Sequence, residues 1–261
     1  MRLTWVWMLT GVALAIASVA FAEIQAKEIE YQQGDSLLQG FMVWPEQTKG
    51  KVPGVLVVHE WWGHNEHARF QARRLAQAGY VALALDMYGK GKLATHPADA
   101  EAFMKEATKD PAVVAARFNA ALDILRKDPR VDGQRIAAIG YCFGGGVVLD
   151  MARSGADLRA VATFHGMLAT NTPAQPRKIK AQVLVLNGAD DPMNPPDVVE
   201  RFKKEMAAAK ARYEVISYPG AKHAFTNPKA DTYGMAALSY NAKVDHQSWA
   251  EMLKMFKTAL K

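Results

Sequence analysis

The sequence contains a single cysteine, Cys142, in 261 residues, and this excludes a disulfide bond within the chain. Low-complexity tracts, blocks of like charge and internal repeats are also missing, which excludes long disordered segments. Half of the residues are apolar and 22% are charged, close to the average for a soluble globular domain. The length suits one large α/β domain with a sizeable core.

A nucleic-acid-binding surface is not indicated either, although the formal net charge is +6. The basic residues are scattered and form only short pairs, such as Arg73-Arg74 and Lys203-Lys204. A basic stripe with interleaved aromatic residues, which typically tracks a nucleic-acid backbone, is missing. We expect a mildly basic, solvated surface and no nucleic-acid partner.

Residues 1–22 have the features of a signal peptide. Arg2 supplies a positive charge, residues 3–22 are almost entirely apolar, and Ala20-Phe21-Ala22 ends in the small residues that a signal peptidase reads. We expect cleavage before Glu23 and export of the mature protein, most simply to a periplasm. After cleavage we expect no stable membrane partner. The alternative is an uncleaved anchor, because the stretch is almost long enough to span a bilayer.

Residues 23–261 then form the folded domain, in which strand and helix patterns alternate. Strands are expected at 24–31, 37–44, 55–59, 80–85, 135–140, 160–164, 183–186 and 213–218. Helices are expected at 66–78, 97–109, 112–127, 144–153, 195–209 and 245–260. Apolar strands at βαβ spacing predict a mostly parallel sheet with helices on both faces, preceded by an antiparallel hairpin. Functional residues in such folds lie just after the carboxyl ends of strands.

The motif Gly140-Tyr141-Cys142-Phe143-Gly144 lies between a predicted strand and a predicted helix. It has the form of a nucleophile elbow, in which crowding by the neighbouring strand and helix requires glycine on either side. The helix N-terminus stabilises negative charge and so favours the thiolate of Cys142. The Phe143 amide is placed to bind an oxyanion. The alternative, a buried thiol in a phosphate-binding turn, lacks the G-x-G-x-x-G pattern and a Lys-Ser/Thr ending.

An acid and a histidine follow the nucleophile in the order that this fold uses. Asp190 and Asp191 compete for the acid; we choose Asp191, because Pro192 restricts its backbone to a turn. His223 follows the last predicted strand and is the candidate general base. His165 also follows a strand and is expected to line the pocket.

The segment from His59 to His67 does not predict a metal site. An H-E-x-x-H motif starting at His59 would need histidine at position 63, which is Gly63. His64 and His67 alone make a poor zinc site. We instead expect the Trp61 amide to be the second oxyanion donor.

At these motifs the sequence resembles the dienelactone hydrolase family, over nearly all of residues 23–261. The segments that carry the resemblance are His59-Glu60-Trp61-Trp62-Gly63, Gly79-Tyr80-Val81, Asp86-Met87-Tyr88, Gly140-Tyr141-Cys142-Phe143-Gly144-Gly145, Gly188-Ala189-Asp190-Asp191-Pro192 and Gly220-Ala221-Lys222-His223-Ala224-Phe225. The cysteine is the most specific feature, because most α/β-hydrolases use serine.

The resemblance implies an α/β-hydrolase fold, a Cys142–His223–Asp191 triad and no cofactor. It also implies that Glu60 holds the resting thiol until substrate binding releases it; the alternative is that Glu60 only caps the helix that follows. The sequence departs from the family at Asn227, where members that open dienelactones have an arginine for the substrate carboxylate. Lysine residues near Tyr88 lack the bidentate fork of arginine.

The sequence therefore predicts a hydrolase of small-molecule esters or lactones, without a metal or another cofactor. Trp62, Tyr88, His165 and Phe225, together with Trp61, are expected to form an aromatic pocket suited to an apolar or ring-containing ester. Two alternatives stay open: a thiol-based redox or sensing protein, and a non-catalytic binding module on the same fold.

Overall fold

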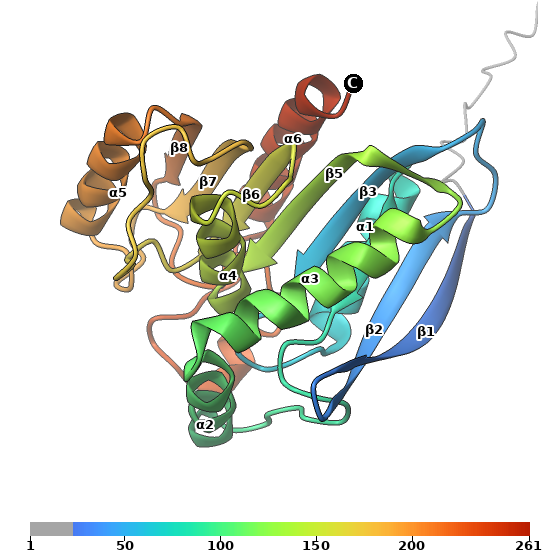
Figure 1. Cartoon of the computed structure of the whole chain (residues 1–261). Helices are drawn as coiled ribbons and strands as arrows, with labels where there is room; N and C mark the ends of the chain where they lie inside the picture. Colours follow the sequence, from blue (N-terminus) through green and yellow to red (C-terminus); the bar gives the residue numbers. More distant parts are fainter. Residues whose placement is uncertain (1–22) are drawn as a thin grey trace, which may run out of the picture.

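The structure is a computed structural model that describes residues 23–261, so the predicted signal peptide lies outside the described residues. An eight-stranded sheet forms its centre, with the strand order β1-β2-β4-β3-β5-β6-β7-β8 (Figure 1). The strands are β1 (Ile24–Gln33), β2 (Ser36–Pro45), β3 (Val52–Val58), β4 (Val81–Leu85), β5 (Val131–Tyr141), β6 (Ala160–Phe164), β7 (Gln182–Gly188) and β8 (Arg212–Tyr218). β1 pairs antiparallel with β2, and β2 with β4. The remaining pairs are parallel, as predicted.

Helices cover both faces of the sheet. They are α1 (Glu66–Gln77), α2 (Pro97–Thr108), α3 (Pro111–Lys127), α4 (Phe143–Arg153), α5 (Pro196–Ala208) and α6 (Ala242–Ala259), with a short 3-10 helix, η1 (Ala230–Tyr233). Side chains of α3, α4 and α5 share one buried apolar cluster, whereas those of α1 and α6 share another. In Figure 1, α3 and α4 lie in front of the sheet, and α1 and α6 lie behind it. Within the described residues, no helix is long and apolar enough to cross a bilayer.

The alternation of side chains along β3 explains why a nearly continuous apolar run forms a central strand. Leu56 and Val58 belong to the cluster beneath α3, α4 and α5, whereas Val55 and Val57 belong to the cluster beneath α1 and α6. All four side chains are fully buried. Because successive residues of a strand point to opposite faces, a strand between two helical layers is apolar at every position.

Several boundaries differ from the prediction, and one element was missed. β5 begins at Val131 instead of residue 135, because its pairing with β3 shifts between Pro53 and Gly54 and bypasses residues 133–135. Helix α6 begins at Ala242, three residues early, because the side chain of Asn241 accepts a hydrogen bond from the Val244 amide and caps the helix. η1 was not predicted, because four residues carry no periodic signal.

Candidate active site

Cys142 lies in a strained turn between β5 and α4. Its backbone has φ 51° and ψ −115°, and it is the residue before the first turn of α4. Such a conformation costs a non-glycine residue about 1–3 kcal/mol, so it persists only where the surroundings hold it. Here the Cys142 amide donates to the Phe164 carbonyl at 3.1 Å, and its carbonyl accepts from the Gly145 amide at 3.0 Å. The side chain is 8% exposed.

The two glycines of the elbow are required by close backbone approach. A Cβ atom on Gly140 would lie 2.0 Å from the carbonyl oxygen of Gly144. A Cβ on Gly144 would lie 2.4 Å from the carbonyl oxygen of Val58 in β3. Both distances are far below van der Waals contact, and both neighbours are backbone atoms that cannot rotate away. The turn can therefore form only with glycine on each side of the cysteine.

His223 and Asp191 come together from the loops after β8 and β7. The Nδ1 atom of His223 lies 2.8 Å from Oδ2 of Asp191. The other carboxylate oxygen, Oδ1, accepts from the Met193 amide at 2.8 Å, which fixes the direction of the acid. Both residues are at most 2% exposed, whereas the neighbouring Asp190 is exposed. Since a carboxylate accepts, Nδ1 of His223 carries the proton in this pair.

The second ring nitrogen of His223 is available for proton transfer. Its Nε2 atom is buried and has no hydrogen-bond partner among residues 23–261. Burial lowers the pKa of His223, but the charge of the nearby Cys142 thiolate and the hydrogen bond to Asp191 outweigh it and raise the pKa to about 10. Cys142 and Asp191 thus both favour the protonated form of the His223 imidazole.

Two backbone amides, one just after β5 and one just after β3, remain unpaired within the described residues. Phe143 is the first residue of α4, a position without an acceptor inside the helix. Trp61 follows β3 in the turn of residues 60–63. Across the described chain, neither amide donates a hydrogen bond. Unpaired N–H groups at such positions can stabilise an oxyanion.

Glu60 is buried at the same edge of the sheet, and its carboxylate is held from two sides. Nδ2 of Asn227 donates to Oε2 of Glu60 at 2.6 Å, and Nδ1 of His67 lies 3.4 Å from the same oxygen. A Glu60–Cys142 hydrogen bond is not present between described residues. The side chain of Asn65, and not that of Glu60, caps the helix that follows.

The predicted pocket residues are almost completely buried. Trp62 and Tyr88 are 2% exposed, and His165 and Phe225 are fully buried. His165 packs edge-to-face against His223, with ring centroids 5.0 Å apart, and Phe225 packs in the same way against His165 at 5.1 Å. Trp61 is more exposed than these four.

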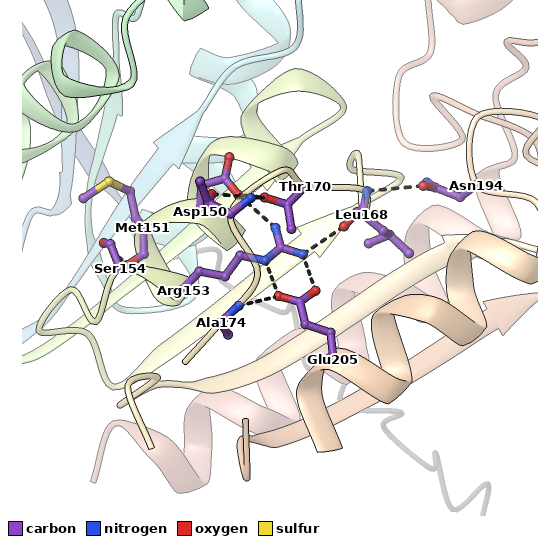
Figure 2. Close-up of polar contacts among 10 residues, drawn as sticks. Asp150, Met151, Arg153, Ser154, Leu168, Thr170, Ala174, Asn194 and Glu205 are labelled. Carbon is purple, nitrogen blue, oxygen red and sulfur yellow. Dashed lines mark hydrogen bonds and ion pairs between the residues drawn. The ribbon is translucent and has the colours of Figure 1, made fainter. Parts of the chain in front are cut away.

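The segment after β6 is fixed beside the nucleophile by residues that sequence reasoning missed. The Met167 amide donates to the Cys142 carbonyl at 3.4 Å. Arg153, at the end of α4, donates to the Leu168 carbonyl at 2.9 Å and also binds Glu205 of α5 (Figure 2). Asn194, three residues after Asp191, accepts from the Leu168 amide at 3.3 Å through its side chain. The sequence signal for this contact was the pair of charged residues, Asp150 and Arg153, in the otherwise apolar α4.

The described residues contain no group of three or more His, Cys, Asp or Glu side chains arranged to hold a metal ion. His67 was considered above as a possible zinc ligand. Its Nε2 atom lies 3.1 Å from Nε2 of Gln71 and 3.2 Å from the carbonyl oxygen of Thr226.

The elbow at the end of a central parallel strand, with an acid on the loop after β7 and a histidine on the loop after β8, defines the α/β-hydrolase class. The sequence profile of the dienelactone hydrolase family matches residues 38–260, and the chain belongs to that family. It is accordingly a hydrolase that acts on ester or lactone bonds.

Relatives agree with this assignment. An Escherichia coli protein named "Putative carboxymethylenebutenolidase" is 32% identical over 236 residues, covering 86% of this chain and 83% of the relative. A solved structure named m3DLH is 39% identical with a TM-score of 0.85, covering 91% and 99% of the two chains. A dienelactone hydrolase-like promiscuous phosphotriesterase from metagenomic libraries is 36% identical with a TM-score of 0.84 and the same coverage.

Proposed function

We propose that the chain hydrolyses small-molecule carboxylic esters or lactones with Cys142 as nucleophile, His223 as general base and acid, and Asp191 as the residue that orients the histidine. One observation carries this proposal: His223 is bonded to Asp191 through Nδ1 at 2.8 Å, its Nε2 is left without a partner among the described residues, and Cys142 is near enough to raise the pKa of the ring. That is the relation between nucleophile, base and orienting acid that covalent hydrolysis needs.

The proposed reaction proceeds through a thioester. His223 Nε2 takes the thiol proton, and the sulfur attacks the substrate carbonyl carbon to form a C–S bond and an oxyanion. When the oxyanion collapses, the C–O bond to the alcohol breaks and His223 protonates the departing oxygen. Water, deprotonated by the same Nε2, then attacks the thioester, and the carboxylic acid leaves as the thiol is restored. In a lactone the alcohol stays attached to the product.

The amides of Phe143 and Trp61 are proposed to hold the oxyanion in both tetrahedral steps. Their position after β5 and β3 and their lack of partners in residues 23–261 support this role. Removing one such donor from a hydrolase typically lowers kcat about a hundredfold to a thousandfold.

Glu60 is proposed to hold the thiol in a resting state and to leave it when substrate binds. In the structure the Glu60 carboxylate is bonded to Asn227 and lies near His67. These two side chains are the partners that the carboxylate needs once it no longer binds the thiol.

The proposed substrate is an uncharged ester or lactone with an apolar or ring-shaped body. Trp61 is the partly exposed aromatic residue that supports this proposal; it packs edge-to-face against Trp62, and its carbonyl accepts from the Tyr88 hydroxyl. The position at which a carboxylate-binding arginine is expected holds Asn227, whose side-chain amide is already used by Glu60. A substrate carboxylate would meet a buried acid there instead of a cation.

Turnover of p-nitrophenyl acetate by the mature protein tests the mechanism. Cys142→Ala is expected to lower kcat at least about a thousandfold, while Asp190→Asn, at an exposed carboxylate, serves as the matched control and keeps the wild-type rate. Equal rates for wild type and Cys142→Ala would remove the cysteine from the mechanism. A panel of neutral lactones, aryl esters and one carboxylate-bearing lactone tests the substrate class, and preference for the last would contradict it.

We also propose that residues 1–22 direct export to an extracytoplasmic compartment, most simply a periplasm. Arg2, the apolar run and the Ala20-Phe21-Ala22 ending support this location. N-terminal sequencing of the protein recovered outside the cytoplasm is expected to begin at Glu23. A retained Met1 would favour the membrane-anchored alternative.

A further inference from the structure

His59 is a buried histidine that the proposed mechanism does not use. It directly follows β3 and precedes Glu60 and Trp61, and its side chain is fully buried. Both ring nitrogens bind backbone groups: Nε2 lies 3.1 Å from the Met87 nitrogen, and Nδ1 lies 2.5 Å from the Glu60 carbonyl oxygen. A histidine this well bonded, one residue from the site, has a defined orientation and a defined proton position.

The two partners determine the tautomer of His59. A backbone N–H can only donate, so Nε2 must offer its lone pair to Met87. A carbonyl oxygen can only accept, so Nδ1 must carry the hydrogen that binds Glu60. The neutral imidazole with the proton on Nδ1 is therefore the one state that satisfies both bonds. Burial lowers the pKa of His59, which keeps the ring neutral.

The bond to the Glu60 carbonyl has a consequence for the next amide. The peptide between Glu60 and Trp61 is planar and trans, so its C=O and N–H groups point in opposite directions. A hydrogen bond that fixes the carbonyl oxygen therefore also fixes the Trp61 N–H. The Gly63 amide adds a second, longer bond of 3.2 Å to the same oxygen. Neither bond consumes the Trp61 amide itself.

His59 also contacts the other oxyanion donor. Its own carbonyl accepts from the Gly144 amide at 3.1 Å, one residue beyond Phe143 in the first turn of α4. The His59 ring packs against the Phe143 ring, with centroids 5.8 Å apart. One residue thus links the loop that carries the Trp61 amide to the helix that carries the Phe143 amide.

We propose that His59 is a positioning residue for the oxyanion site, whose Nδ1–H holds the Glu60 carbonyl and thereby aims the Trp61 N–H at the substrate oxygen. This inference rests on the proposed hydrolytic function. His59 touches neither the substrate nor the sulfur in this role. Its effect reaches the reaction through the Glu60–Trp61 peptide.

Two substitutions of similar polarity separate this role from a general structural one. The side-chain amide of His59→Asn can place an N–H near the position of Nδ1 and keep the donor to Glu60. The longer side chain of His59→Gln reaches the position of Nε2 instead and loses that donor. With p-nitrophenyl acetate we expect kcat to fall about a hundredfold in His59→Gln and less than about tenfold in His59→Asn, with KM little changed in both.

Alkylation of Cys142 by iodoacetamide supplies the second readout, because displacement at a saturated carbon forms no oxyanion. The alkylation rate is expected to match the wild type in both variants. Equal kcat losses in the two variants, or alkylation that slows in parallel with hydrolysis, would overturn the proposal. If instead Cys142→Ala hydrolyses the ester as fast as wild type, the hydrolytic function itself fails, and the two failures are distinguished.

A measurement on the unaltered protein keeps the inference testable if a variant does not fold. The ¹⁵N chemical shifts of the His59 ring distinguish a hydrogen on Nδ1 from one on Nε2. We expect the Nδ1–H tautomer at neutral pH. An Nε2–H tautomer or a doubly protonated ring would refute the proposed bond to Glu60 and with it the positioning role.

Discussion

Replacing Arg153 with methionine should destabilise the protein strongly, because Arg153 and Glu205 form a buried ion pair between α4 and α5 (Figure 2). Their side chains are 3% and 13% exposed. The guanidinium contacts both Glu205 oxygens at 2.8 and 2.9 Å, the Leu168 carbonyl at 2.9 Å and Asp150 at 2.9 Å. Without it, the Glu205 carboxylate keeps only the Ala174 amide within the described chain.

The magnitude follows from what remains behind. Removing one member of a buried ion pair typically costs about 3–5 kcal/mol, because the other charge stays buried without its partner. Arg153→Met should lie in that range, since it also leaves the Leu168 carbonyl without this donor. Glu205→Leu should cost less, because Arg153 can still bind the half-exposed Asp150. The double variant, with an apolar pair, should lose less than the sum of the two single variants.

Urea unfolding followed by circular dichroism measures these free energies, with Arg201→Met as the matched control. Arg201 pairs with Asp197 on the surface of α5, where both side chains are 65% exposed. Exposed pairs contribute about 0–1 kcal/mol, so this control should change stability very little. The reasoning fails if Arg153→Met loses no more than the control, or if the double variant loses the full sum.

Three further outcomes are expected. Gly144→Ala should cost about 3 kcal/mol or prevent folding, because its Cβ would lie 2.4 Å from a backbone oxygen of β3; urea unfolding or the yield of soluble protein measures this. Asp191→Asn should lower kcat at least about a hundredfold in the nitrophenyl ester assay, and no loss would contradict the role of the acid. Because the pKa of His223 is raised above 6.5 to about 10, the stabilisation that it contributes should be present below pH 6.5 and lost as the pH rises through about 10. Cys142→Ala should flatten that decline in urea-unfolding free energy, and an unchanged slope would refute the coupling.

Much of the fold could be predicted because its signals are local or periodic. Apolar runs such as residues 55–59 identified buried parallel strands, and the Gly140–Gly144 spacing identified the turn that carries Cys142. The signal that favoured Asp191 over Asp190 is also local, because it is the proline at the next position, Pro192. In the structure Asp191 is bonded to His223, and the catalytic role of the acid stays a prediction.

The contacts that hold the site together could not be predicted, because they join residues that are far apart in the sequence. Glu60 and Asn227 are 167 positions apart, and Arg153 and Glu205 are 52 apart. Such pairs depend on the order of strands in the sheet, in which β4 lies between β2 and β3. Alternating strand and helix patterns predict a parallel sheet but do not determine that order. The orientation of the His59 ring has the same origin, since Met87 comes from the neighbouring strand end.

The direction of β1 determines how the domain could be tethered. Ile24 pairs with Pro45, and β2 runs antiparallel to β4, so the described chain enters the sheet at the amino ends of the parallel strands. The sulfur, the imidazole and the two free amides gather at the opposite rim. An attachment upstream of Ile24, to a bilayer or to an engineered support, would therefore leave the reactive rim facing outward. Immobilisation through the N-terminus should preserve substrate entry.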